Sequence, residues 1–347
     1  MKFKKQKKIL KYLGLLIIAL AFYAVLKLFV LALFFKPFDR TIYVDNGSRT
    51  WAQNGSFRFP FKDLKEAIVF LKINPQFNKI IIREGLYEGA FGLPKGVALV
   101  GEGENVILQN PKENFLSLDS GGGKTYDHFS NAVLALKGEN YVENIKIKKG
   151  FYGVYLFKDA AVELNNCLID GAYEFGIYNH PFTLWEKKVI IRDSRIINSK
   201  KQGLYLNGGT FEIVNTTIRD NGEEGLDIHS GVDIKVVDSD ISNNGEGGVE
   251  ADLGYNRIDI RNCVISQNVA SGIKLQSNRE HSVVILKNNL ITKNRDHGLE
   301  CSIHRHTKKS YFTRAFSEDL EVIKIDNQIK NNNWEDDYEN VGSRCKK

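Results

Sequence analysis

Proline is scarce in this sequence, at 6 of 347 residues, whereas glycine occurs 30 times and hydrophobic residues make up 42%. Disordered chains are rich in proline and poor in hydrophobic residues. The composition therefore excludes a largely disordered chain, and it supplies enough apolar side chains to bury a core.

Net positive charge is also lacking over most of the chain. The formal net charge is +6, but the first 36 residues hold eight lysines and no acidic residue, so residues 37–347 carry a net charge of −2. A nucleic-acid-binding domain would carry a basic surface of its own. The net positive charge of the chain comes from its N-terminus, so no nucleic acid is expected as a partner.

The N-terminus joins a basic segment to a long apolar run. Five lysines lie within residues 1–8, and the apolar run over residues 9–35 is interrupted only by Lys11 and Lys27. A run of this length can cross a membrane, and the lysine bias places residues 1–8 in the cytoplasm. The alternative is a cleaved signal peptide, whose apolar region is shorter. We predict an uncleaved, single-pass signal anchor in the cell membrane, with the rest of the chain outside, periplasmic or extracellular.

Cysteine is scarce as well, with four in the chain. Cys167 and Cys263 occupy equivalent places in a repeat, in NNCLI and RNCVI, whereas Cys301 lies at an apolar position of that repeat and Cys345 lies in the tail. An exported protein could form disulfides. These positions instead predict buried, unpaired thiols.

The chain has an internal repeat in which the motif glycine–aliphatic–x–aliphatic–x returns seven times. The copies are GVYLF (153), GIYNH (176), GLYLN (203), GLDIH (225), GVEAD (248), GIKLQ (272) and GLECS (298). Each copy is followed by a second short strand pattern and a corner rich in Asn or Asp. Strands this short cannot bury an apolar side alone, so the repeats must stack into a solenoid. The frame of leucine-rich repeats is absent.

Three short strands per turn with asparagine at one corner resemble the right-handed parallel β-helix proteins of the pectin-lyase-like superfamily. The resemblance covers about residues 41–333. It implies an all-β solenoid, with a helical N-terminal cap and the first turns at 41–110, β-helix repeats at 111–333 and a polar C-terminal tail at 334–347. A cap is physically required, because the terminal turn otherwise exposes unpaired backbone. Six residues are predicted to stack at one corner: Asn166, Asp193, Thr216, Ser239, Asn262 and Asn289.

Alternate side chains of a strand face opposite ways, so both x positions of the motif point outward from one parallel sheet. The first outward column is predicted to be Tyr155, Tyr178, Tyr205, Asp227, Glu250, Lys274 and Glu300. The second is predicted to be Phe157, His180, Asn207, His229, Asp252, Gln276 and Ser302. Ionisable groups therefore cluster beside an aromatic end. The aromatic end either stabilises neighbouring strands or stacks on sugar faces.

The hexapeptide EGLDIH, which begins at Glu224, resembles a Tyr-Gly-Phe-Asp-Pro-His motif of mannuronan C5-epimerases and related alginate-active enzymes. Gly225, Asp227 and His229 match in spacing, whereas Glu224 replaces the tyrosine and Ile228 replaces the proline. The motif strings of polygalacturonases and of calcium-type pectate lyases are absent.

This resemblance implies an acidic polysaccharide as substrate and removal of the C5 proton of a uronate, by an epimerase or a lyase. His229 would be the base, because its pKa lies near neutrality. Asp227 would orient it or raise its basicity, and Tyr205 would carry the second proton. Lys274, the region of Arg305 or a metal would neutralise the substrate carboxylate. The remaining predicted substrate-binding residues are Tyr155, Tyr178, His180, Asn207, Glu250, Asp252, Gln276, Glu300 and Arg305.

Two other functions stay open. Asp227, Glu250 and Asp252 could supply the acid and base of a glycoside hydrolase. Alternatively, the protein is a non-catalytic module that binds a glycan or another envelope protein. No cofactor is required and no metal-binding residue is assigned, although the same carboxylates could hold Ca²⁺. The basic connection around Arg305 either closes one end of the cleft or is an ordinary solvated loop.

Overall fold

The computed structural model describes residues 17–23, 26, 40–111, 117–120, 123–126, 128–179, 187–277, 281–303 and 320–332. The chain forms two compact units, Met1–Thr41 and Ile42–Lys347. The second unit contains the repeats and is the one in which a site can be built from side-chain geometry.

The first unit contains the predicted membrane anchor. Its described residues 17–23 and 26 are helical, with exposed apolar side chains such as Ile18 and Phe22. Among the residues that the structure describes, no helix is long and apolar enough to cross a membrane. Residues 1–8 and most of the predicted span 9–35 lie outside the described residues, so the anchor stays a prediction.

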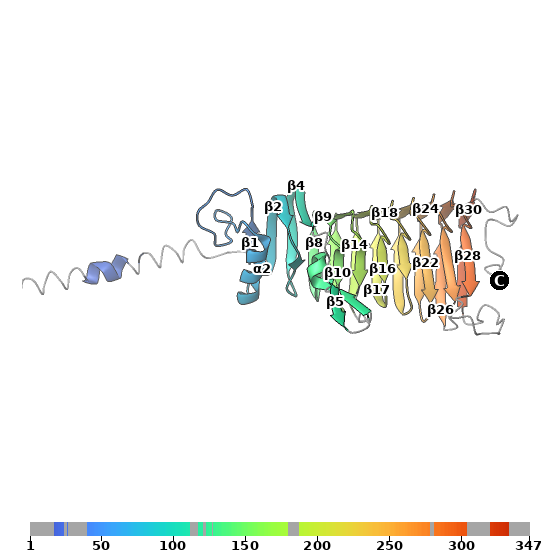
Figure 1. Ribbon diagram of the computed structural model, residues 1–347, viewed down its shortest axis with the longest axis horizontal. Helices are drawn as coiled ribbons and strands as arrows, with labels where there is room; N and C mark the ends of the chain where they lie inside the picture. The colour runs from blue at the N-terminus through green and yellow to red at the C-terminus, as the bar shows by residue number, and fades with distance from the viewer. Residues whose placement is uncertain are drawn as a thin grey trace, which may run out of the picture. The chain divides into compact units, whose positions relative to one another are not determined.

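The second unit begins with strand β1 (Thr41–Val44) and helix α2 (Leu64–Ile73), which lies beside the first strands of the stack (Figure 1). The helix starts at Asp63, whose carboxylate accepts a hydrogen bond from the backbone N–H of Lys65 at 2.7 Å. The buried residues of the helix are Leu64, Ala67, Ile68 and Leu71. Their spacing puts all four on one face, so the helix covers apolar side chains of the first turns.

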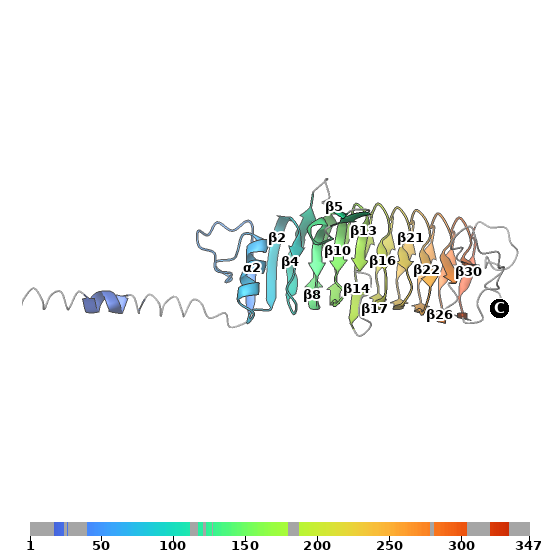
Figure 2. The same cartoon turned by 60° about the horizontal axis from the view of Figure 1, so that its bottom comes forward.

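Beyond the helix, parallel strands stack turn upon turn, as Figure 2 shows. One sheet has nine strands in the order β28-β25-β22-β19-β16-β13-β10-β7-β3. Its strands are β3 (Phe91–Gly92), β7 (Ala132–Leu136), β10 (Tyr152–Leu156), β13 (Phe175–Asn179), β16 (Leu204–Leu206), β19 (Leu226–Ile228), β22 (Val249–Leu253), β25 (Ile273–Ser277) and β28 (Leu299–Ile303). Each glycine motif of the repeat contributes one of these strands.

The other strands of each turn form a 19-stranded parallel sheet that also includes β1. Its further strands are β2 (Lys79–Glu88), β4 (Ala98–Asn110), β8 (Glu139–Glu143), β9 (Lys146–Lys149), β11 (Ala161–Asn165), β12 (Leu168–Asp170), β14 (Lys188–Arg192), β15 (Arg195–Ile197), β17 (Gly209–Val214), β18 (Thr217–Arg219), β20 (Val232–Val237), β21 (Asp240–Ser242), β23 (Arg257–Arg261), β24 (Val264–Ser266), β26 (Ser282–Lys287), β27 (Leu290–Thr292), β29 (Leu320–Ile325) and β30 (Gln328–Lys330). A hairpin of β5 (Ser117–Ser120) and β6 (Gly123–Tyr126) and the short helix α3 (His128–Asn131) complete the described elements. The predicted parallel β-solenoid is confirmed.

The glycine of the motif is needed because successive turns approach closely there. A Cβ atom on Gly225 would lie 2.8 Å from the backbone oxygen of Gly248 and 2.7 Å from Cγ2 of Ile241. A Cβ on Gly248 would meet the oxygen of Gly272 at 2.6 Å. Any side chain would therefore push neighbouring turns apart, which explains why glycine recurs.

Two ladders of side chains line the corner between the paired strands of the large sheet. In the outer ladder, the side-chain amide of Asn166 donates to Asn144 Oδ1 at 2.7 Å, and that of Asn215 donates to Asp193 Oδ1 at 2.6 Å. Its members, all with positive φ, are Asn144, Asn166, Asp193, Asn215, Asp238, Asn262, Asn288 and Asp326. Asn and Asp are the side chains that best tolerate this left-handed backbone.

The inner ladder lies one residue further along the chain. Its members include Cys167, Ser194, Thr216, Ser239, Cys263, Asn289 and Asn327. The predicted stack mixed the two ladders and was wrong by one residue for half of its members: Asn166, Asp193 and Asn262 are outer, whereas Thr216, Ser239 and Asn289 are inner. The error arose because inner and outer positions both carry small polar residues.

A third ladder of buried asparagines runs through the next corner and was not predicted. The side-chain amide of Asn221 donates to Asn244 Oδ1 at 3.0 Å, Asn244 donates to Asn268 at 3.0 Å, and Asn268 donates to Asn294 at 2.9 Å. Asn332 ends the series, accepting from Asn294 at 2.9 Å. Each buried amide is thereby satisfied by its neighbours in adjacent turns, which fixes the register of the stack.

Two of the four cysteines behave as predicted. Cys167 and Cys263 are buried and unpaired, and burial raises the pKa of their thiols to about 12 and about 11. Cys301 is disulfide-bonded, so the prediction of an unpaired thiol is wrong there. Cys345 lies outside the described residues. The sequence pattern identified an apolar position at Cys301, and that alone does not exclude a cross-link.

Candidate functional site

The nine-stranded sheet carries the first outward column in the predicted register. Backbone pairing joins, in order, Tyr155, Tyr178, Tyr205, Asp227, Glu250, Lys274 and Glu300. The aliphatic residues on either side of each outward residue, such as Leu226 and Ile228, are fully buried. The glycine motif therefore does place one aromatic-to-acidic column along one face of the sheet.

The aromatic end of this column is buried instead of open. Tyr155 is only 2% exposed and packs in a cluster with Tyr152 and Phe151. Its ring stacks on that of Tyr178, with centroids 5.9 Å apart and planes at 13°, and Tyr178 stacks on Tyr205 at 5.3 Å and 17°. The predicted role of Tyr155 in substrate binding is corrected, because no face of its ring is left for a sugar. At this end the aromatic side chains pack on one another and stabilise neighbouring strands, which is the first of the two predicted roles.

The second outward column is described only in part. His180 and Arg305 lie outside the described residues, as does the side chain of Ser302. Asn207 is half-buried, and its backbone N–H donates to Oδ1 of the fully buried Asn179 at 2.6 Å. The predicted roles of His180 and Arg305 therefore stay predictions.

The central element of the candidate site is a carboxylate–imidazole pair at the end of β19. Nε2 of His229 lies 3.3 Å from Oδ2 of Asp227, and the two side chains are 30% and 14% exposed. The imidazole also packs on the ring of Tyr205, with centroids 4.5 Å apart. Gln202 donates to the same carboxylate oxygen of Asp227 at 3.4 Å. The three residues predicted as base, orienting group and proton carrier therefore lie in contact.

Opposing effects set the protonation of this pair. Burial alone would lower the pKa of His229, but the hydrogen bond to Asp227 and the charges of Asp227, Asp252 and Glu250 outweigh it, so the pKa is raised above its ordinary value. Burial, with the charge of Asp227, raises the pKa of Tyr205 to about 12. At neutral pH Tyr205 is therefore a protonated phenol, and it lies beside an imidazole whose pKa is raised above its ordinary value.

The predicted cation Lys274 is held by an acid on the neighbouring strand. Its Nζ lies 3.1 Å and 3.2 Å from the two carboxylate oxygens of Glu250, which also accepts a hydrogen bond from Gln276. Burial would lower the pKa of Lys274, but Glu250, Glu300 and Glu224 raise it overall. Asp252 pairs with Gln276 in the backbone register. Lys274 is therefore charged, and its charge is largely offset by Glu250.

Glu224 is a member of the site that sequence reasoning treated only as a departure from a motif. Its side chain is 6% exposed and accepts a hydrogen bond from Gln202 at 3.0 Å. Burial, a hydrogen bond with Glu246 and the charges of Asp227 and Glu250 raise the pKa of Glu224 to about 8. The available signal was the recurrence of an acid before the motif glycine in successive turns, because Glu224 and Glu246 precede Gly225 and Gly248 and such stacked positions come close together.

Negative charge dominates the face as a whole. Among the described residues of the two columns and Glu224, Lys274 is the one permanent cation, against the acids Glu224, Asp227, Glu250, Asp252 and Glu300. Neighbouring carboxylates disfavour one another's charged forms. Glu224, whose pKa is raised to about 8, can hold a proton near neutral pH. An anionic ligand that binds to this face must pair with a cation or displace one of the acidic side chains.

A cavity of about 600 Å³ lies elsewhere, over the large sheet. Its lining includes Lys79, Glu139, Tyr141, Glu163 and Lys188. The polar residues that line it are ordinary charged side chains on neighbouring strands. No residue of the two outward columns lines this cavity. We therefore place the candidate site on the nine-stranded sheet, where the acid–base geometry is.

A family model described as "Right handed beta helix region" matches residues 95–256 and 186–316, which together cover more than half of the chain. No curated protein matches the sequence. Among solved structures, pectate lyase Pel9A is similar with a TM-score of 0.50 at 13% identity, covering 84% of this chain and 70% of that one.

Two epimerase structures are also similar. The periplasmic alginate epimerase AlgG gives a TM-score of 0.46 at 14% identity, covering 74% of this chain and 72% of that one. The A-module of the Azotobacter vinelandii mannuronan C-5 epimerase AlgE4 gives 0.42 at 14% identity, covering 76% and 92%. At such identities a structural likeness concerns the fold and assigns no activity.

Proposed function

The chain belongs to the right-handed β-helix family, and on this fold we propose that the cluster around His229 acts on an acidic, uronate-containing polysaccharide by removing the C5 proton of a uronate residue. One observation carries the proposal: the Asp227 carboxylate lies 3.3 Å from His229, whose other face packs on Tyr205. A base, its orienting carboxylate and a phenol are the groups that this chemistry requires.

In the proposed reaction His229 is the general base. With its proton on Nε2, which faces Asp227, the imidazole has its lone pair on Nδ1. That nitrogen takes the C5 proton, and Asp227 stabilises the imidazolium that forms, as in other carboxylate–histidine pairs. Asp227 is therefore a positioning residue, and its loss should affect the pKa of the base as well as the rate.

The geometry supports a lyase over an epimerase. The rings of Tyr205 and His229 are 4.5 Å apart, which leaves no space for a sugar between them, so both approach a substrate from the same side. Inversion at C5 needs a proton donor on the face opposite the base. In β-elimination the C5–H bond breaks to His229, its electron pair forms the C4–C5 double bond, the C4–O bond breaks, and Tyr205 protonates the departing oxygen.

Lys274 would neutralise the uronate carboxylate and so stabilise the carbanion that develops beside it. Because Glu250 holds the Lys274 ammonium at 3.1 Å, the substrate must displace Glu250 or share the cation with it. The described outward residues Tyr178, Asn207, Asp252, Gln276 and Glu300 would contact further sugar units along the sheet. The mechanism requires no cofactor; Ca²⁺ held by the same carboxylates would only assist binding.

We further propose that residues 9–35 anchor the protein in the cell membrane, with residues 1–8 in the cytoplasm and the β-helix outside. The lysine-rich start and the apolar run support this topology. Protease added to spheroplasts, in which any outer membrane is opened and the cell membrane is intact, should digest an epitope placed after Lys347 and spare one placed before Lys4. Protection of the C-terminal epitope would contradict the proposal.

A polymer panel tests the proposed activity. Full-length protein in mild detergent is incubated with polymers of mannuronate, guluronate, galacturonate and glucuronate, and unsaturated products are followed by ultraviolet absorbance. We expect unsaturated products with one polymer, their loss in His229→Gln, and full activity in the matched control His281→Gln, which removes an exposed histidine. Polymer binding without conversion would replace the proposal with the binding-module function.

A glycoside hydrolase is the second candidate, and Glu224 is the observation that favours it. A carboxylic acid protonated near neutral pH is what protonates a glycosidic oxygen, and Asp227 nearby stays available as base or nucleophile. This candidate predicts new reducing ends without unsaturation, on a neutral or an acidic glycan. Glu224→Gln would abolish that activity, whereas the lyase would keep most of its rate.

A further inference from the structure

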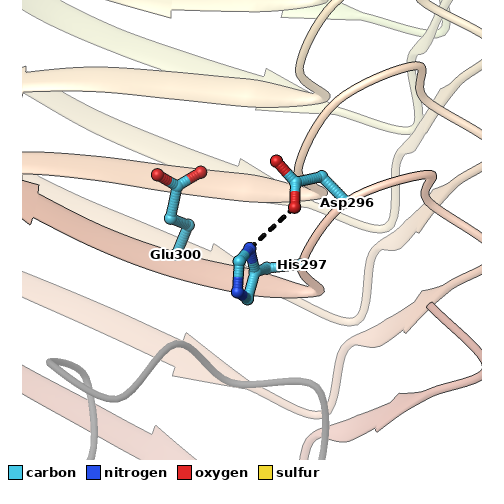
Figure 3. Close-up of side chains that lie close together, drawn as sticks. All are labelled: Asp296, His297 and Glu300. Carbon is cyan, nitrogen blue, oxygen red and sulfur yellow. Dashed lines mark ion pairs between the residues drawn. The ribbon is translucent and has the colours of Figure 1, made fainter. Parts of the chain in front are cut away.

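Three side chains capable of binding a metal meet at the start of β28, as Figure 3 shows. Asp296 and His297 lie in the turn that leads into the strand, and Glu300 lies within it. One ligand atom from each lies within 4.8 Å of the other two. Asp296 and His297 precede the motif glycine Gly298, outside the two outward columns, so the repeat pattern does not single them out.

The surrounding contacts hold these side chains in place. Nδ1 of His297 lies 2.9 Å from Oδ1 of Asp296. The Ser271 hydroxyl donates to Oε2 of Glu300 at 2.7 Å. Hydrogen bonds to a side chain that coordinates a metal orient that side chain and increase its affinity for the metal. The Asp296 and His297 side chains are 35% and 19% exposed, so an ion can enter from solvent and keep water on its open side.

We propose that Asp296, His297 and Glu300 bind one divalent cation of the Zn²⁺ class. One imidazole and two carboxylates suit Zn²⁺ or a similar borderline ion, whereas Ca²⁺ takes six to eight oxygens and rarely a nitrogen. Bonds of about 2.0–2.1 Å to a tetrahedral ion need ligand atoms about 3.4 Å apart. The ligand atoms lie within 4.8 Å of one another, so binding requires them to move closer together, and Glu300 can do so through Oε1, the oxygen that Ser271 does not bind. Three protein ligands leave a fourth position open.

The site is separate from the acid–base cluster. In the sheet register Glu300 is three strands from Asp227, with Glu250 and Lys274 between them. At a strand spacing of about 4.8 Å, this is roughly 14 Å. The ion therefore takes no part in proton transfer at His229, and its existence does not depend on the proposed function. Its open position would face the same side as Lys274, where an oxygen of a bound glycan can reach it.

The competing account is that Asp296 and His297 form only an ion pair beside an ordinary carboxylate. Calorimetry separates the two. Full-length protein in mild detergent, stripped with EDTA and then freed of it, is titrated with ZnCl₂, and CaCl₂ is titrated in parallel. We expect one Zn²⁺ site per chain and no measurable Ca²⁺ at that site. Titration heats at the level of buffer alone would overturn the proposal.

Variants assign the site. His297→Gln and Glu300→Gln should each weaken Zn²⁺ binding at least 100-fold, and Ser271→Ala, which releases Glu300, should weaken it about 10-fold. His281→Gln should change nothing. Thermal melts in EDTA check folding. Zn²⁺ should raise the melting temperature of wild type and of His281→Gln equally, that of Ser271→Ala less, and those of His297→Gln and Glu300→Gln least. The basic connection after β28 also holds two histidines, His304 and His306, on either side of Arg305. Binding that survives in His297→Gln but is lost when both of these are replaced by Gln would place the ion elsewhere and refute the assignment.

Discussion

Tyr155 and Lys274 occupy the same register position of one sheet, yet they differ in their exposure to solvent. Tyr155 is 2% exposed inside an aromatic cluster, whereas Lys274 is 29% exposed and paired with Glu250. Both side chains leave the backbone in the same direction. Whether an outward side chain of a β-helix is buried or available to a ligand therefore depends on what packs over it. The alternation of side chains along a strand predicts only the direction in which each one points.

Replacing His229 should produce the largest effect on the acidic end. His229→Ala removes the proposed base, so we expect turnover of the polysaccharide to fall by about 10²- to 10⁴-fold. The side chain is partly exposed, so stability should change by less than about 1 kcal/mol. Steady-state rates and a urea titration measure both. Retained turnover would show that the acidic end is not the reaction centre.

The aromatic end should respond in the opposite way. Tyr155→Ala removes a buried ring that stacks on Tyr178, and we expect a loss of about 3–5 kcal/mol in the free energy of unfolding. The variant should still turn over substrate at temperatures where it is folded. Tyr155→Phe is the matched control and should keep most of the stability. If Tyr155→Ala left stability unchanged but raised KM, the ring would be a sugar platform after all.

The pH profile separates positioning from structure at Asp227. His229 must be neutral to act as base, so activity should rise with pH through a pKa above the ordinary histidine value. Asp227→Asn removes the charge and the carboxylate hydrogen bond that contribute most to raising this pKa, whereas Asp252 and Glu250 remain, so the low-pH limb of the profile should move to lower pH. We expect kcat to fall about 10- to 100-fold as well. If the low-pH limb of the activity profile did not move, a group other than His229 would be responsible for it.

Glu250→Gln should give the smallest effect. The substitution leaves the Lys274 ammonium without its ion pair and removes a negative charge from the path of an anionic substrate. We expect KM to fall a few-fold with kcat little changed, and the difference to shrink at high salt, where charges are screened. A large loss of kcat would instead make Glu250 part of the reaction, which favours the hydrolase.

Periodicity made the fold and the first column predictable. A glycine every turn, forced by close approach at positions such as Gly225 and Gly248, fixes both the strand and its register. From that register followed the placement of Asp227 beside Glu250 and of Glu250 beside Lys274.

Burial and corner register were less predictable. Tyr155 is covered by Phe151, Tyr152 and Tyr178, and strand alternation predicts the direction of a side chain but not that these rings pack over one another. The corner ladders accept Asn, Asp, Ser, Thr or Cys at adjacent positions, so composition does not separate the inner Thr216 from the outer Asn215. Glu224 and His297 precede the motif glycines, and their roles depend on neighbours in other turns, Gln202 and Ser271 among them.

The central claim, that His229 removes a proton from C5, is tested most directly by isotopic substitution of that hydrogen. The polymer that the panel identifies is prepared with deuterium at C5, and its turnover is compared with that of the unlabelled polymer at saturating concentration. The account predicts a clear slowing with the deuterated polymer and deuterium-free unsaturated products. Equal rates, with deuterium retained at C5 in every product, would contradict it.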